Sequence, residues 1–285
     1  MVKERKYQTK FGENGFWQIE PSLAVKWLKT QKINRTLRVV DVERWSRDMS
    51  AGKWNVNGET IKFDAEGALI DGQHRLQACL KAQTTFVSWV VFDLPVTTAQ
   101  ESVDIGRRRT PGDQLSLRGE IDTTNLAAAL RWLWRYEKRL MLGYTGFTPL
   151  RTNSRQAPPT MQELFALLEQ HPQIRKSLSY GNLTFKLLPK SLMTMLHYQM
   201  TQKDTLLADW FVRTLASGEA LTQSDALWYL RRRLTDNRSS RAKLQHSELA
   251  ALTIKAWNLH RAKKPCKALR FYWQGDKPEN FPVIE

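Results

Sequence analysis

The segment IDGQHRLQACLKA, residues 70–82, decides how the first part of this chain folds. An apolar run ends at Ile70, and residues 75–81 place apolar side chains at helical spacing. Five polar or turn-forming residues, 71–75 (DGQHR), lie between the two. The pattern predicts a strand, a tight turn and a helix in succession.

The predicted turn has the composition of an anion site. The first N–H groups of a helix have no partner within the helix, and the helix dipole favours negative charge there. Gly72 allows a ligand to approach the backbone, and Arg75 can bind two phosphate oxygens at once. His74 can donate to a phosphate or shuttle a proton, and Asp71 can act as a general base, a metal ligand or a helix cap. With Gln73, these residues predict a phosphate site, although each has an ordinary structural use as well.

The strand, DGQHRLQA turn, helix and following strand resemble the ParB/sulfiredoxin superfamily, in the subset with a DGQHR motif. The approach to the turn is also similar, through Asn34-Arg35, a helix over residues 42–49, Gly52-Lys53-Trp54 and residues 57–60. The resemblance covers roughly residues 17–120. It implies a ParB-like nucleotide-binding domain in a prokaryotic or phage protein.

By this resemblance, the turn binds the phosphates of a nucleoside triphosphate or diphosphate, ATP or CTP, with Mg²⁺. Arg75 corresponds to the phosphate-binding arginine of the family. Gln73 occupies the position of the sulfiredoxin cysteine, which argues against sulfinic acid reduction. Asp71-Gly72-Gln73 replaces Gly-Glu-Arg, so the acidic residue lies elsewhere in the turn and no metal ligand is assigned from the family.

A second cluster of candidate phosphate ligands lies at residues 104–113. Arg107, Arg108, Arg109 and Thr110 can close over the same phosphates or contact a nucleic-acid backbone. Thr110 before Pro111 also fits the cap of a helix. A solvated basic loop is an equally simple interpretation.

Charge is distributed unevenly along the 285 residues, whose net charge is +16. Residues 225–270 contain twelve Lys or Arg against three Asp or Glu, whereas residues 1–120 contain nineteen against fifteen. Clustered cations gain affinity for polyanions by releasing counterions from phosphates. We therefore expect DNA or another nucleic acid as the partner of the second part. The candidate contacts are Arg231, Arg232, Arg233, Arg238, Arg241, Lys243, Lys263 and Lys264, with further basic residues at 261, 267 and 270.

The fold class that these patterns predict is α+β. We expect a mixed ParB/sulfiredoxin-like domain over residues 1–120 and a mostly α-helical basic domain over residues 121–285. Strands are expected at 60–63, 68–70 and 86–94, and helices at 21–30, 40–51, 125–140, 190–200, 204–217, 224–234 and 247–261. The composition, 41% hydrophobic and 25% charged, is that of a globular protein. We expect a cytoplasmic location and no membrane partner, because the chain has two cysteines and no long apolar run.

Three functions remain open from the sequence. The first is a nucleotide-binding ParB-like protein that binds DNA through its basic helices, with a homodimer as one expected assembly. The second is an enzyme that uses Asp71 and His74 for NTP hydrolysis, for phosphoryl transfer or as a nuclease, on a nucleic acid or a modified nucleotide. The third is a non-catalytic interaction protein in which the turn has only a structural role.

Overall fold

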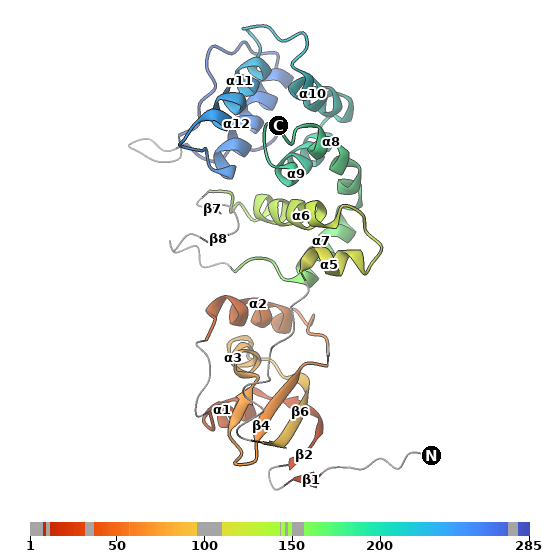
Figure 1. Ribbon diagram of the computed structural model, residues 1–285, viewed down its shortest axis with the longest axis vertical. Coiled ribbons are helices and arrows are strands. Elements are labelled where there is room, and N and C mark those ends of the chain that lie inside the picture. The colour runs from red at the N-terminus through yellow and green to blue at the C-terminus, as the bar shows by residue number, and fades with distance from the viewer. Residues whose placement is uncertain are drawn as a thin grey trace. The chain divides into compact units, whose positions relative to one another are not determined.

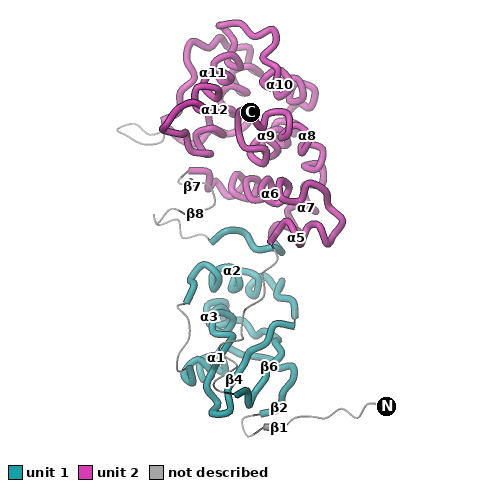
Figure 2. The backbone as a smooth tube through the Cα atoms, in the orientation of Figure 1, with its two compact units in different colours: residues 1–108, 156–162 teal, residues 109–155, 163–285 magenta. Residues whose placement is uncertain are grey.

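The computed structural model divides the chain into two compact units (Figure 2). One contains residues 1–108 and 156–162, and the other contains residues 109–155 and 163–285. The division therefore falls about a dozen residues before the expected boundary at residue 120. The structure describes residues 8–9, 12–31, 37–56, 58–95, 110–142, 144–145, 148–149, 157–272 and 279–285.

The first unit is built on a four-stranded mixed sheet with the order β3-β6-β4-β5. Its neighbouring strands β4 and β6 are labelled in Figure 1. β4 runs parallel to β6, and the other neighbours are antiparallel. The sequence predicted β4, β5 and β6, whereas it did not predict β3. The bounds are β3 Gly15–Ile19, β4 Thr60–Asp64, β5 Leu69–Asp71 and β6 Phe86–Leu94, beside the short pair β1 Gln8–Thr9 and β2 Gly12–Glu13.

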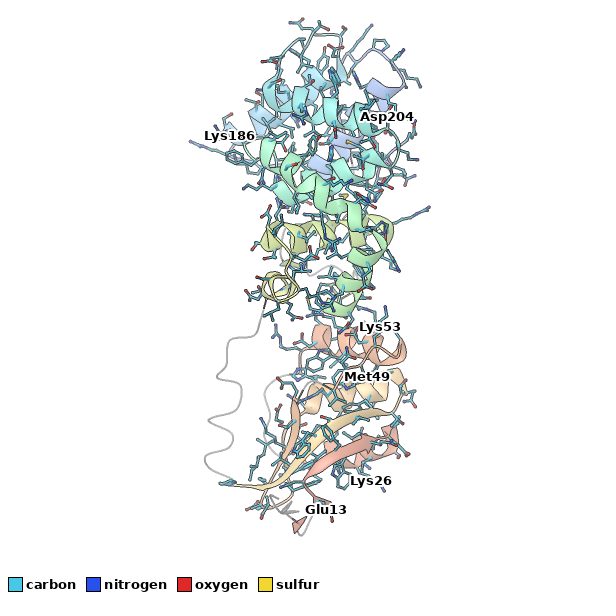
Figure 3. The ribbon with its side chains drawn as sticks, turned by 90° about the vertical axis from the view of Figure 1, so that its right-hand side faces the viewer. Glu13, Lys26, Met49, Lys53, Lys186 and Asp204 are labelled. Atoms are coloured by element: carbon cyan, nitrogen blue, oxygen red, sulfur yellow. The ribbon has the colours of Figure 1, made fainter. Side chains whose placement is uncertain are left out.

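The core of the first unit lies between this sheet and its helices. Alternate side chains of β6 are buried, as expected for a strand with one face covered. Phe63 and Phe92 stack there with ring centroids 4.9 Å apart. Met49, labelled in Figure 3, lies on the buried side of α2, which packs on α3. The helices are α1 Pro21–Leu28, α2 Val39–Ser50 and α3 Gln73–Ala82.

The second unit is mostly helical, so the α+β assignment holds for the chain. α9 is its centre, because residues 192–198 are all buried and α6, α8, α10 and α12 pack around it. The last described residues pack back onto the unit, where Trp257 Nε1 donates to the Glu285 carbonyl at 3.1 Å. The bounds are α5 Pro111–Ser116, α6 Thr123–Glu137, β7 Tyr144–Thr145, β8 Thr148–Pro149, α7 Met161–Gln170, η1 Pro172–Ser177, α8 Leu178–Leu183, α9 Lys190–Thr201, α10 Thr205–Ser217, α11 Ala226–Ser239 and α12 His246–Arg261.

Candidate functional site

The DGQHR turn forms as the sequence predicts, with the strand β5 before it and the helix α3 after it. Gly72 is the N-cap of α3 and has a left-handed backbone, with φ 109° and ψ −1°. A β-carbon at this position would lie 2.9 Å from Cγ1 of Ile61 on β4, so the turn requires glycine. Asp71 is the preceding residue rather than the N-cap, and its Oδ1 accepts the Gly72 N–H at 2.7 Å.

Arg75 points back to the sheet. Its Nη2 donates to the Thr60 carbonyl at 2.7 Å and to Asp71 Oδ2 at 3.3 Å. Glu59 Oε2 lies 4.0 Å from the other terminal nitrogen, and Lys62 Nζ lies 3.6 Å from Asp71 Oδ2. Two cations and two carboxylates therefore balance one another, and the guanidinium joins the start of α3 to the start of β4.

His74 likewise joins α3 to another element of the first unit. Its Nε2 accepts the Arg38 N–H at 2.9 Å, and Arg38 is the N-cap of α2. The neutral ring therefore carries its proton on Nδ1. The edge of the ring meets Trp45 of α2, with centroids 6.1 Å apart. His74 thus fixes the beginning of α2 against α3.

The four residues 72–75 are all buried, and the contacts of Asp71, His74 and Arg75 are made with other parts of the same unit. These contacts are sufficient to explain why the turn contains these residue types. The structure does not place the other predicted phosphate ligands at the turn. Arg107, Arg108 and Arg109 lie outside the described residues. Thr110 belongs to the second unit, where its hydroxyl accepts the Asp113 N–H at 3.2 Å and caps α5, as the alternative interpretation predicts.

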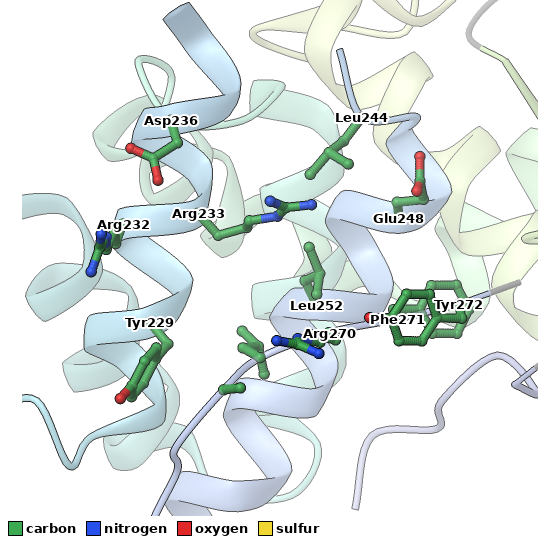
Figure 4. A pocket seen from close by; sticks show the side chains of 12 residues that line it. Tyr229, Arg232, Arg233, Asp236, Leu244, Glu248, Leu252, Arg270, Phe271 and Tyr272 are labelled. Carbon is green, nitrogen blue, oxygen red and sulfur yellow. The ribbon is translucent and has the colours of Figure 1, made fainter. Parts of the chain in front are cut away.

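The basic residues of the second unit surround a hollow between α11, α12 and the segment that follows α12 (Figure 4). Its volume is about 480 Å³. The guanidinium groups of Arg233 and Arg270 point into the space between the two helices, on either side of Leu252 (Figure 4). Other side chains that line it are Arg232, Tyr229, Tyr272, Phe271, Asp236 and Glu248. We call this hollow the aromatic cavity.

A second hollow of about 380 Å³ lies on the other side of Leu244, which lines both cavities. Its charged lining consists of Lys186, Arg238 and Lys243, without an Asp or Glu. Lys186 projects outward from the unit (Figure 3), and its Nζ lies 5.7 Å from the centre of the Phe185 ring. We call this hollow the cationic cavity. Together the two cavities bring Arg232, Arg233, Arg238 and Lys243 to one region. Lys243 Nζ donates there to the Asn237 carbonyl at 2.9 Å and to the Arg238 carbonyl, so it caps the end of α11.

The remaining basic residues of the prediction have other positions. Arg231 is half-buried and donates from Nη1 to the carbonyls of Leu215 and, at 2.8 Å, Ala216, at the end of α10. It is therefore a capping residue, unlike its two neighbours on α11. Arg241 is exposed between α11 and α12, and Lys263 and Lys264 are exposed just after α12.

The structure also brings together a serine, a histidine and an aspartate that the sequence did not indicate. His197 Nδ1 lies 2.9 Å from Ser177 Oγ, and His197 Nε2 lies 3.0 Å from Asp209 Oδ1. Ser177 has only 2% of its surface exposed, so its hydroxyl cannot attack a substrate. Burial lowers the pKa of His197, while the Asp209 carboxylate acts in the opposite direction. This trio is a hydrogen-bond network that joins η1, α9 and α10, with Ser177 and His197 buried and Asp209 partly exposed.

The aromatic residues 228–229 beside the arginines of α11 could be read from the sequence, whereas the acidic lining and the other aromatic residues of the cavities could not. Tyr272, Asp236 and Glu248 were not indicated, and neither were Phe185 and Lys186, which precede α9. One signal for Tyr272 was present in the sequence, because residues 271–273 (FYW) form an aromatic run next to basic residues. The others are brought to the basic region only by tertiary packing.

Comparisons with protein-family models, with curated proteins and with solved structures each found no match. Among the described residues, no group of three or more His, Cys, Asp or Glu side chains is placed to hold a metal ion. A search of the same residues found no helix of the length and apolar character that crossing a bilayer requires.

Proposed function

We propose that the chain binds nucleic acid through the second unit. The observation that carries this proposal is that exposed Arg233 and Arg270 point into the aromatic cavity, next to a cavity whose charged lining is entirely cationic. Guanidinium groups bind phosphate oxygens in pairs, and each neutralised phosphate releases counterions. The +9 excess over residues 225–270 supplies the long-range attraction for a polyanion.

The test is fluorescence anisotropy with labelled oligonucleotides at low salt. The double variant Arg233→Ala/Arg270→Ala removes two cations from the cavity, and we expect it to bind about tenfold more weakly. Lys53→Ala is the control, because Lys53 is an exposed lysine of the first unit (Figure 3). Equal affinity of the wild type, the double variant and the control would exclude this surface as the binding site.

A second proposal is nucleotide binding by the DGQHR turn, which the resemblance to ParB-like domains suggests. The left-handed Gly72 and the start of α3 favour it, because a helix N-terminus attracts phosphate. Arg75 already donates hydrogen bonds to the Thr60 carbonyl and to Asp71 Oδ2. A bound phosphate would therefore share the guanidinium donors with these two groups. Calorimetric titration of the wild type with ATP, CTP and GTP, each with Mg²⁺, tests the proposal. Absence of binding up to about 1 mM nucleotide would refute it.

Wild-type titration is preferable to an Arg75 variant here, since loss of Arg75 would disturb the fold whether or not nucleotide binds.

The contacts give less support to catalysis by Asp71 and His74. His74 Nε2 already accepts a backbone N–H, and Asp71 accepts from Gly72 and Arg75. A general base needs an accessible lone pair directed at the substrate.

A further inference from the structure

The aromatic cavity contains two features that binding to phosphates alone does not require. Three aromatic side chains, Tyr229, Phe271 and Tyr272, line it together with the arginines. Asp236 and Glu248 also line it, and carboxylates repel the phosphate backbone. Glu248 has a structural role as well, because its Oε2 accepts the Gln245 N–H at 2.7 Å in the capping box of α12. A surface that served only to contact a duplex backbone would gain nothing from the aromatic rings or from Asp236.

Both features match an unstacked nucleobase. A base has a flat π face that stacks on tyrosine or phenylalanine, and arginine planes can stack on it as well. Its exocyclic amino groups donate hydrogen bonds, which carboxylates accept. The volume of about 480 Å³ is within the range of small-molecule sites.

The cationic cavity has the charge to hold the backbone phosphate next to such a base. It shares Leu244 with the aromatic cavity, so the two hollows are immediate neighbours along the surface. Lys186, Arg238 and Lys243 line it without an Asp or Glu, which is the charge pattern that a phosphate needs. Lys186 and Arg238 are the candidate phosphate contacts, because Lys243 Nζ already donates to the carbonyls of Asn237 and Arg238 at the end of α11. Adjacent sites for a base and for backbone phosphate are the repeating pattern of a single strand, in which bases are free to turn away from their neighbours.

We propose that the second unit binds single-stranded nucleic acid, with one base in the aromatic cavity and the adjoining backbone phosphate in the cationic cavity. In a duplex the bases are stacked and paired, so a base must first leave the helix to enter such a cavity. This inference rests on the proposed nucleic-acid binding and specifies its substrate.

The experiment compares four labelled or competing probes on the full chain: a mixed-sequence DNA strand of about 16 nucleotides, the matching RNA strand, the DNA duplex and a free mononucleotide. We expect at least one single strand to bind about tenfold or more tightly than the duplex and far more tightly than the mononucleotide. Tyr272→Ala removes a stacking face from an exposed residue and should weaken single-strand binding about tenfold. Tyr272→Phe keeps the ring and should restore it.

The control for this variant is Phe16→Ala, since Phe16 is an exposed aromatic residue of the first unit. Duplex affinity equal to single-strand affinity, with no effect of Tyr272→Ala, would overturn the inference and leave nucleic-acid binding intact. Mononucleotide affinity equal to that of the strand would overturn it in favour of a nucleotide site. Failure to bind any of the strands or the duplex would instead refute the proposed function itself.

Discussion

At the scale of single residues, Gly72 is the position where the DGQHR turn tolerates least change. A side chain there must adopt a φ of 109° and must also displace Ile61 in the core. Gly72→Ala should therefore lower the free energy of unfolding by about 3 kcal/mol, from backbone strain together with overpacking. Urea denaturation of the full chain measures the change.

Gly52 provides the matched control for this substitution. Its φ is +64°, but an added β-carbon would have no neighbour within 4 Å. Gly52→Ala should cost about 1 kcal/mol, from backbone strain alone. If the two variants lose equal stability, the contact with Ile61 is not what fixes glycine at residue 72.

The DGQHR motif also shows what residue types reveal and what they leave open. The sequence predicted the turn, its glycine and the helix after it, because these depend on local conformation. The directions of His74 and Arg75 depend on partners distant in the sequence, the Arg38 N–H and the Thr60 carbonyl. Arginine binds a backbone carbonyl and a phosphate oxygen with the same donors, so its identity alone does not distinguish the two uses.

At the scale of elements, the strand and helix patterns differ in how clearly they can be read. β6 was predicted with its observed bounds, since six of its nine residues are Phe, Val or Trp, which have strong β propensity. β3 was missed because its outward-facing residues include Phe16, which is 64% exposed and hides the apolar–polar alternation. α11 was predicted to end near residue 234 and continues to Ser239, because its last turn is polar.

α11 gives the clearest contrast between neighbouring residues. Arg231 caps α10 through two carbonyls, whereas Arg233 points into the aromatic cavity. Arg231→Met should lower the free energy of unfolding by about 1–2 kcal/mol and leave nucleic-acid affinity nearly unchanged. Arg233→Met should leave the free energy of unfolding nearly unchanged and should lower the nucleic-acid affinity. Urea denaturation and anisotropy on both variants test this, and a loss of affinity in Arg231→Met without loss of stability would contradict it.

α9 and its neighbours are expected to respond to pH. Burial lowers the pKa of His197, His246 and His260, all in the second unit. Below about pH 6.5 the unfolded chain binds protons that the folded unit does not, so stability must fall as pH falls. Each histidine contributes at most ~1.4 kcal/mol per pH unit. Hydrogen exchange of the α9 amides should therefore accelerate between pH 7 and pH 5, after correction for the intrinsic exchange rate.

His197→Gln tests how much of this response comes from the network with Ser177 and Asp209. Glutamine does not titrate, so the variant should be less stable at pH 7 but should show a weaker pH dependence. An unchanged pH dependence would assign the effect to His246 and His260 instead.

At the scale of the whole molecule, the net charge of +16 determines how binding responds to salt. For single strands, the slope of log Kobs against log salt is about −0.7 for each phosphate that the protein neutralises. Lys186→Ala and Arg238→Ala should each make the slope less negative by about 0.7, because each removes one phosphate contact at the cationic cavity. Arg231→Ala should leave the slope unchanged, since that guanidinium is held by the carbonyls of α10.

Tyr272→Ala should lower affinity at every salt concentration with the slope preserved, because stacking releases no counterions. Anisotropy titrations from about 50 to 200 mM salt measure all four slopes, and an altered slope in Tyr272→Ala would show that this residue acts on phosphates and not on a base.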